Sequence, residues 1–211
     1  MLGIVGYGGF VASAAALCLT PGIDTVYILT RTVSGGRREG LASALGINAG
    51  LVVHTILVAA GLSLLLAASP VAFGAIKVAG AAYLAVMGVR SILSGGSSFS
   101  VGEKDEGTSA GSSLRVFAQG VLTNVLNPKI ILFFLALLPQ FVVTPNPFGP
   151  VPFLALGLTY VALSTLWTVV IVAVASPFSR LLTRSPRAGR VTSVVSGLVY
   201  IALGATIFLT A

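Results

Sequence analysis

Two short stretches decide how this chain folds: LTNVLNPK at residues 122–129 and TPGID at residues 20–24. Each places a proline and an ionisable residue, Lys129 or Asp24, inside an apolar segment long enough to cross a bilayer. A charge at the centre of a membrane span costs roughly 2.5–3.5 kcal/mol on insertion scales, and proline interrupts a helix. A proline and an ionisable residue inside apolar spans, at corresponding places in two halves of a chain, predict the binding site of a transporter.

The composition predicts a polytopic membrane protein. Of the 211 residues, 56% are hydrophobic and only 8% are charged, whereas a soluble domain carries about 25% charged residues. The net charge of +7 does not indicate nucleic-acid binding, because the basic residues lie in short loops between apolar spans. The single cysteine, Cys18, excludes an intrachain disulfide and a cysteine metal cluster. No cofactor or metal is expected.

Six apolar segments are each near or above the length of a membrane-spanning helix. A stretch rich in Gly, Ser and charge, at about residues 94–114, divides them into repeat 1 (about 1–93) and repeat 2 (about 115–211) of a single transporter domain, 1–211. No basic residue precedes Arg31, so we expect the first span to be retained rather than removed as a signal peptide. The segments are 3–30, 41–66, 70–93, 115–141, 150–176 and 191–210.

The loop charges predict the orientation. Basic residues gather in three of the five connections, whereas the connections at 67–69 and 142–149 carry no charge. The positive-inside rule then places the three basic loops in the cytoplasm and both termini outside. The basic residues are Arg31, Arg37, Arg38, Arg90, Lys104, Arg115, Arg180, Arg184, Arg187 and Arg190.

Three spans in each half predict an inverted 3+3 repeat, because the second half must then enter the membrane upside down. Two matches support it: residues 80–85 (GAAYLA) resemble 197–202 (GLVYIA), and Thr20-Pro21 corresponds to Asn127-Pro128. The expected fold is therefore an all-α integral membrane protein with six transmembrane helices.

Both dipeptides combine a capping side chain with a proline suited to the first position of a helix. We therefore expect helices 1 and 4 to be broken at Pro21-Gly22 and at Pro128. The restarted helices would point their N-termini, with partial positive charge and free N–H groups, at each other across the mid-membrane. That arrangement suits a carboxylate.

Asp24 and Lys129 are the main candidates for substrate binding, as acceptor for an ammonium group and donor to a carboxylate. Asn124, Asn127 and Thr20 are candidate companions. The alternatives are a structural ion pair for the two charges and backbone capping for the other three.

His54 is the only histidine and lies within a predicted span. Together with Asp24 it is a candidate proton relay, and a hydrogen-bonded packing histidine is the equal alternative. In the same span the small residues Ala42, Gly46 and Gly50 recur every four residues, which predicts close packing on a neighbouring helix.

These motifs resemble the LysE/RhtB family of amino-acid exporters. The resemblance runs in order through residues 20–24, 35–40, 46–54, 77–84 and 119–141. It implies export of amino acids from the cytoplasm, driven by the proton gradient. The family usually has Thr-Pro-Gly-Pro in the first motif, and here Ile23 replaces the second proline. The family transports basic, hydroxylated and branched amino acids; one Asp against one Lys favours a zwitterion, and so small neutral amino acids.

Several alternatives stay open: export of basic amino acids, ions or other small metabolites on the same fold, or a structural membrane subunit. An intramembrane enzyme would need a catalytic pair that the sequence does not show, so we expect no enzyme. The expected location is the bacterial plasma (inner) membrane. The expected partners are the amino-acid substrate, protons and the lipid bilayer, with a homodimer as an open alternative and no nucleic acid.

Overall fold

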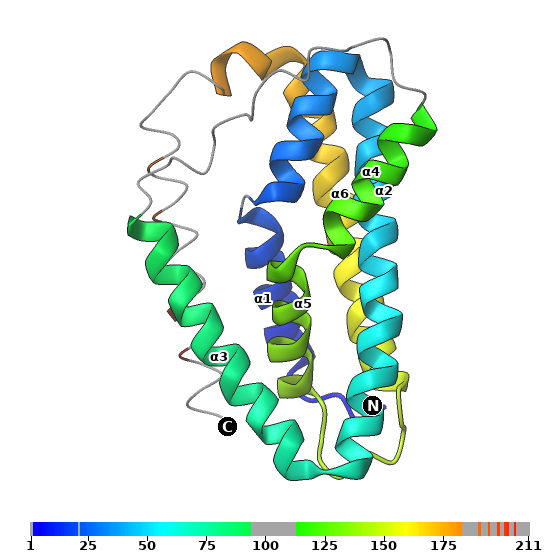
Figure 1. The fold of residues 1–211 in the computed structure, drawn as a ribbon, viewed down its shortest axis with the longest axis vertical. Coiled ribbons are helices and arrows are strands. Elements are labelled where there is room, and N and C mark those ends of the chain that lie inside the picture. Colours follow the sequence, from blue (N-terminus) through cyan, green and yellow to red (C-terminus); the bar gives the residue numbers. More distant parts are fainter. Residues whose placement is uncertain are drawn as a thin grey trace.

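The computed structural model describes residues 2–20, 22–93 and 113–182 and the single positions 190, 194, 198, 201, 202 and 205. Its elements are α1 (Tyr7–Leu19), α2 (Ile23–Ala68), α3 (Pro70–Leu93), α4 (Ser113–Val125), α5 (Pro128–Leu137), the 3-10 helix η2 (Leu138–Phe141) and α6 (Val151–Leu182) (Figure 1). The described part of the chain has no strand beyond an isolated antiparallel bridge between Ile4 and Val142. It is all-α, as predicted.

Helix α2 consists of two helices joined at Gly36. Gly36 has φ 74° and ψ −173°, which is not helical and which glycine adopts without the steric penalty of a side chain. The chain reverses direction at this turn, at the top of Figure 1. Residues 23–35 therefore continue the first predicted span after α1, and residues 37–68 contain the second.

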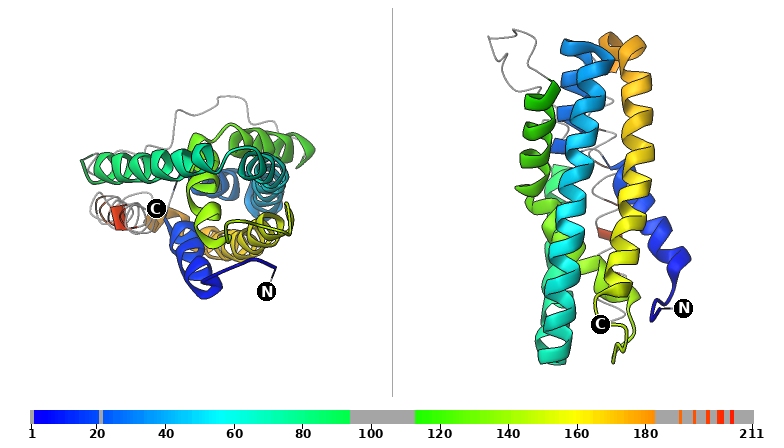
Figure 2. Two further views of the ribbon diagram at one scale, coloured as in Figure 1. Left: turned by 90° about the horizontal axis from the view of Figure 1, so that it is seen from below. Right: turned by 90° about the vertical axis from the view of Figure 1, so that its right-hand side faces the viewer.

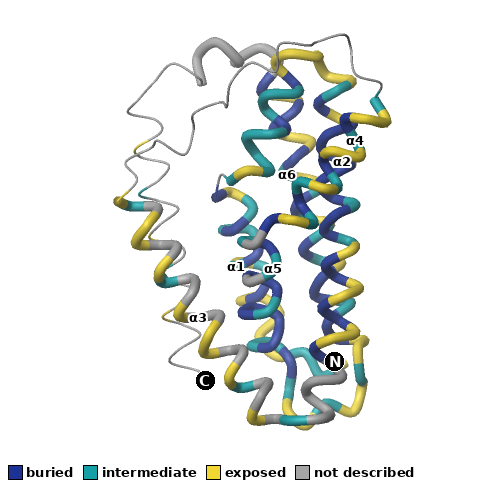
Figure 3. Tube along the Cα trace, viewed as in Figure 1, coloured by how far each residue is buried: buried dark blue, intermediate teal, exposed yellow. Residues whose placement is uncertain are grey.

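The outer faces of the helices are apolar. Leu57 on α2 is 61% exposed and Leu166 on α6 is 67% exposed, and exposed side chains of this kind recur along both helices (Figure 3). Among the described residues, two helical stretches are long and apolar enough to cross a membrane: Ile23–Leu62, which includes the Gly36 turn, and Val151–Ala175. A third is the pair Ser113–Val125 and Lys129–Phe141, bent by 55°. A surface this apolar is typical of a protein in lipid.

The other predicted spans differ in how far the structure describes them. Helix α3 has the bounds of the third span, and α6 contains the fifth and continues beyond it to Leu182. The sixth predicted span, 191–210, lies almost wholly outside the described residues.

Both predicted breaks interrupt a helix. Thr20, after α1, has φ −79° and ψ 109°, and Asn127, before α5, has φ −77° and ψ 104°. Each precedes a proline, whose ring disfavours the helical conformation for the residue before it. Pro128 is the first residue of α5, whereas Pro21 lies outside the described residues.

Helix α2 packs chiefly on α4 and α6, and its second part runs alongside α6 (Figure 2, right). The contact with α4 is close because glycines face each other. A methyl group at Gly46 would collide with the Phe117 carbonyl, and one at Gly120 would lie 2.9 Å from the Ser43 carbonyl oxygen. The predicted small-residue stripe is confirmed as a helix-packing face.

The described residues form two hydrophobic clusters in the interior. The aromatic cluster lies toward the N-terminal end of α6 and contains Phe10, Phe133, Phe134, Phe153 and Tyr160 among other buried residues. The smaller aliphatic cluster lies toward the Gly36 turn and consists of Ile28, Ala44, Ile47, Ile171 and Val172. The helix breaks come between the two clusters.

Candidate functional site

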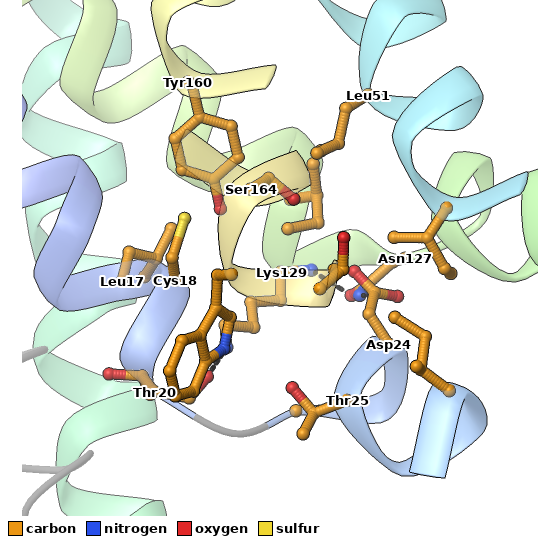
Figure 4. A pocket seen from close by; sticks show the side chains of 16 residues that line it. Leu17, Cys18, Thr20, Asp24, Thr25, Leu51, Asn127, Lys129, Tyr160 and Ser164 are labelled. Carbon is orange, nitrogen blue, oxygen red and sulfur yellow. Dashed lines mark hydrogen bonds between the residues drawn. The ribbon is translucent and has the colours of Figure 1, made fainter. Parts of the chain in front are cut away.

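A small cavity lies at the level of the two breaks (Figure 4). Its volume is about 40 Å³, and α1, α2, α5 and α6 contribute to its wall. Members of the aromatic and the aliphatic cluster both line it, so it separates them. The polar residues of the wall are Cys18, Thr20, Asp24, Thr25, Asn127, Lys129, Tyr160, Ser164, Trp167 and Thr168.

Asp24 lies in the first turn of α2 and is bound by amides from the other break. Its carboxylate accepts hydrogen bonds from Asn124 Nδ2 at 2.8 Å and Asn127 Nδ2 at 3.2 Å. The N-terminus of a helix also stabilises a negative charge. The carboxylate is thus held by groups of α2 and of the α4–α5 junction together.

Lys129 makes the reciprocal contact. Its Nζ donates to the Thr20 carbonyl at 3.4 Å, where α1 ends and a positive charge is favourable. Lys129 Nζ passes close to Gly22, where an added methyl group would lie 3.0 Å from it. Each break therefore supplies a charged side chain to the other, and both charges face the same cavity (Figure 4).

Asn127 and Thr20 do not act alike. Asn127 Oδ1 accepts from the Lys129 backbone N–H at 3.1 Å, so Asn127 caps α5 as predicted. The Thr20 hydroxyl donates backwards to the Ala16 carbonyl at 2.9 Å. The prediction that Thr20 caps the restarted helix is wrong. The carbonyl of Gly22 accepts from Val26 N–H, so Gly22 occupies the position before α2.

His54 lies behind the cavity and does not reach it. It is buried, and its Nε2 lies 3.0 Å from the Asn124 carbonyl oxygen at the end of α4. Its ring lies 6.2 Å from that of Phe134. Asn124, also buried, joins His54 to Asp24 through its backbone and its side chain. Neither His54 nor Asn124 lines the cavity.

Sequence reasoning missed the wall that α6 contributes. Tyr160, Ser164, Trp167 and Thr168 are spaced by four, three and one residues, which places them on one side of a helix. A run of polar and amphipathic residues at helical spacing within the apolar segment 150–176 was the available signal. Cys18 also lines the cavity.

A polar network lies between the cavity and the Gly36 turn. Arg31 donates to Gln119 Oε1 at 2.7 Å and lies 4.0 Å from the Glu39 carboxylate. Tyr27, under the Arg31 guanidinium, donates its hydroxyl proton to the Val116 carbonyl at 2.7 Å. The network joins both parts of α2 to α4.

The chain is similar to known membrane proteins. The family model described as LysE type translocator matches residues 15–210. The uncharacterized membrane protein YrhP of Bacillus subtilis is 34% identical over 139 residues, which are 63% of this chain and just under two thirds (66%) of that protein.

Two further relatives match more of the chain. The homoserine/homoserine lactone efflux protein of Salmonella typhi is 33% identical over 150 residues, 71% of this chain and 70% of that protein. An uncharacterized membrane protein of Vibrio cholerae is 33% identical over 177 residues, 84% and 83% of the two chains. No solved structure matches.

Proposed function

This chain belongs to the LysE type translocator family, and on that premise we propose that it exports small neutral amino acids from the cytoplasm. The family consists of transporters rather than enzymes. The observation that carries the proposal is the cavity between the breaks, which places the carboxylate of Asp24 and the ammonium of Lys129 inside an apolar protein. Such charges in a membrane segment indicate a functional site.

The two charges suit a zwitterion. In the proposed complex Lys129 binds the substrate carboxylate, and Asp24 binds its ammonium group or the coupling proton. Asn124 and Asn127 hold Asp24 in place, and the Thr20 carbonyl holds Lys129. A dibasic amino acid would bring a second positive charge to a cavity whose wall has one carboxylate, which favours neutral substrates. The efflux protein of Salmonella typhi, named for homoserine and its lactone, supports the same class.

We assign proton coupling to Asp24, with His54 as the group behind it. His54 and Asp24 both contact Asn124, so a proton on either one changes the electrostatic environment of the other. A structural role for His54, satisfying the carbonyl of Asn124 at the end of α4, accounts for the same contact.

The proposed architecture is six spans in an inverted 3+3 repeat, with repeats at 1–93 and 115–211 and the 94–114 linker in the cytoplasm. Matching backbone conformations at Thr20 and Asn127 support the repeat. The basic residues beside the Gly36 turn support a cytoplasmic position for that end and both termini outside the plasma membrane. A homodimer is compatible with this architecture, and a non-transporting structural subunit is the alternative of another class.

Alternating access requires the cavity to open at each end in turn. Toward the Gly36 turn, the proposed cytoplasmic end, the five-residue aliphatic cluster and the Arg31 network cover the cavity. At the other end, the proposed outer one, the larger aromatic cluster covers it. We therefore propose that the Arg31 network is the inner gate.

Transport by inside-out vesicles tests the proposal. Vesicles containing the protein should accumulate labelled small neutral amino acids when a proton gradient is imposed, and a protonophore should abolish the accumulation. Lysine, arginine and inorganic ions serve as competing substrates. Uptake of every compound no greater than that of vesicles without the protein would contradict the proposal and leave the structural role. Vesicles carrying Asp24→Asn test the assignment of Asp24.

A further inference from the structure

The cavity has two unlike walls. The breaks contribute charge, through Asp24 and Lys129, whereas α6 contributes Tyr160, Ser164, Trp167 and Thr168, which are neutral. A zwitterion uses the charged wall for its ammonium and carboxylate groups. Its side chain is then directed to the remaining surface, to which α6 contributes these four neutral residues.

The polar groups of α6 differ in their hydrogen bonding. Thr168 Oγ1 accepts from Asn48 Nδ2 at 3.0 Å and donates to the Thr165 carbonyl at 3.1 Å. In contrast, the indole Nε1 of Trp167 is buried and has no hydrogen-bond partner in the part of the chain that the structure describes. Buried donors are nearly always paired, so an orphan of this kind needs an explanation.

We infer, on the basis of the proposed function, that Trp167 is a specificity-determining residue whose indole N–H donates to an oxygen atom on the substrate side chain. The substrate class is then narrower than neutral amino acids: it is small neutral amino acids whose side chain carries a hydrogen-bond acceptor. Indole is a donor only, so a purely aliphatic side chain leaves it unpaired.

The size of the cavity is consistent with this role. A volume of about 40 Å³ holds about three water molecules, at 10–15 Å³ for each. An amino acid has more heavy atoms than that, so its entry must displace part of the wall. A displacement that opens the α6 side brings the buried N–H of Trp167 into contact with the substrate. The hydrogen bond that then forms favours binding of a substrate whose side chain carries an oxygen atom.

A packing role for Trp167 is the alternative. The ring packs against the aliphatic cluster beside Tyr27 and Leu29, and a tryptophan that only packs would affect the amount of folded protein and the overall rate. It would not change the ratio of export between two substrates of the same shape. The ratio therefore separates the two roles.

Threonine and valine are the probes, because their side chains have nearly the same shape and differ in a hydroxyl group. A site built to bind a substrate hydroxyl discriminates strongly against the analogue that lacks it. The wild-type protein in inside-out vesicles should export threonine at least tenfold better than valine, which corresponds to about 1.4 kcal/mol. Trp167→Phe, which keeps an aromatic ring and removes the N–H, should bring the ratio close to one.

The matched control is Thr165→Val on the same helix. Thr165 does not line the cavity, and its hydroxyl bonds to the Val161 carbonyl of its own helix. This variant should keep the wild-type ratio. Because each ratio is internal to one preparation, a lower yield of folded variant does not alter it.

A second measurement needs no variant. Trp167 is the only tryptophan in the chain, so the intrinsic fluorescence of the purified protein reports on this residue alone. Increasing concentrations of threonine should shift the emission wavelength of Trp167 until the shift reaches a constant value. Valine at the same concentrations should cause no shift.

The outcomes separate this inference from the proposed function. A wild-type ratio near one, or an unchanged ratio in Trp167→Phe, would overturn the role of Trp167 and leave amino-acid export standing. If Trp167→Phe does not fold, equal fluorescence responses to threonine and valine overturn it instead. Absence of export of any amino acid by the wild type would overturn both.

Discussion

The two helix breaks share a backbone and differ in their side chains. Thr20 and Asn127 agree within a few degrees in φ and ψ, at −79° and 109° against −77° and 104°, because each precedes a proline. The Thr20 hydroxyl nevertheless turns back to α1, whereas Asn127 caps α5 and reaches across to Asp24. The proline determines where the helix is interrupted, and the side chain before the proline determines which hydrogen bonds form at the interruption.

The difference makes the second break the organiser of the site. Asn124, Asn127 and Lys129 from the α4–α5 junction contact Asp24 and the Thr20 carbonyl of the first break. The first break contributes one carboxylate and backbone groups. An inverted repeat would thus have kept the conformation in both halves and given most of the polar chemistry to one.

The largest effect is expected from the charges that link the breaks. Asp24→Asn and Lys129→Met should each abolish export and lower the free energy of unfolding by about 3–5 kcal/mol, because a buried charge then loses its opposite. The double variant should recover much of the stability and stay inactive. Vesicle transport and thermal unfolding measure the two effects.

Arg38→Met is the control for the charged pair, since Arg38 is exposed near the Gly36 turn, and it should change neither property greatly. Export by the double variant at the wild-type rate would mean that the pair is scaffolding rather than a binding site.

A smaller effect should distinguish the two residues that precede the prolines. Asn127→Ala removes the cap of α5, worth about 1 kcal/mol, and a hydrogen bond to a carboxylate, worth about 1.5–3 kcal/mol. Thr20→Val removes only a bond to its own helix and should cost about 1 kcal/mol or less. Chemical denaturation and transport should rank the variants in that order. Equal losses of stability and transport in Asn127→Ala and Thr20→Val would show that the residues before the two prolines have the same role.

The smallest effect concerns the packing behind the second break. A methyl group at Gly50 would lie 2.7 Å from the side chain of Asn124, so Gly50→Ala should displace the amide that binds Asp24 and cost about 1–3 kcal/mol. Gly61→Ala is the control on the same helix, because a methyl group there meets nothing within 4 Å.

Transport should decrease in Gly50→Ala and be unchanged in Gly61→Ala, which gains a better helix former. If both variants transport normally, the position of Asn124 does not limit the site.

Several features could be predicted from local sequence because they depend on local physics. Hydropathy predicted the helical membrane protein, Pro128 predicted the restart of α5, and the spacing of Gly46 and Gly50 predicted a close helix contact. Asp24 and Lys129 stood out because charge is expensive in a membrane wherever the fold places it.

Other features could not be predicted, because they depend on which helices become neighbours. Nothing local shows that Thr20 bonds backwards, that the Asn124 carbonyl meets His54, or that Lys129 reaches the end of α1. Arg31 and Gln119 are 88 residues apart and meet at 2.7 Å only because α2 folds back at Gly36 beside α4.

By itself, then, the sequence determined the membrane environment, the places where helices stop and the residues that carry charge, since each follows from hydropathy, backbone sterics or the cost of burying an ion. Only the tertiary structure decided that each charge is bound by groups of the other break, and that α6 contributes a neutral wall, including Trp167, to the same cavity. A hydrogen bond and a cavity depend on positions in three dimensions, and residues 24, 129 and 167 become neighbours only when the helices pack.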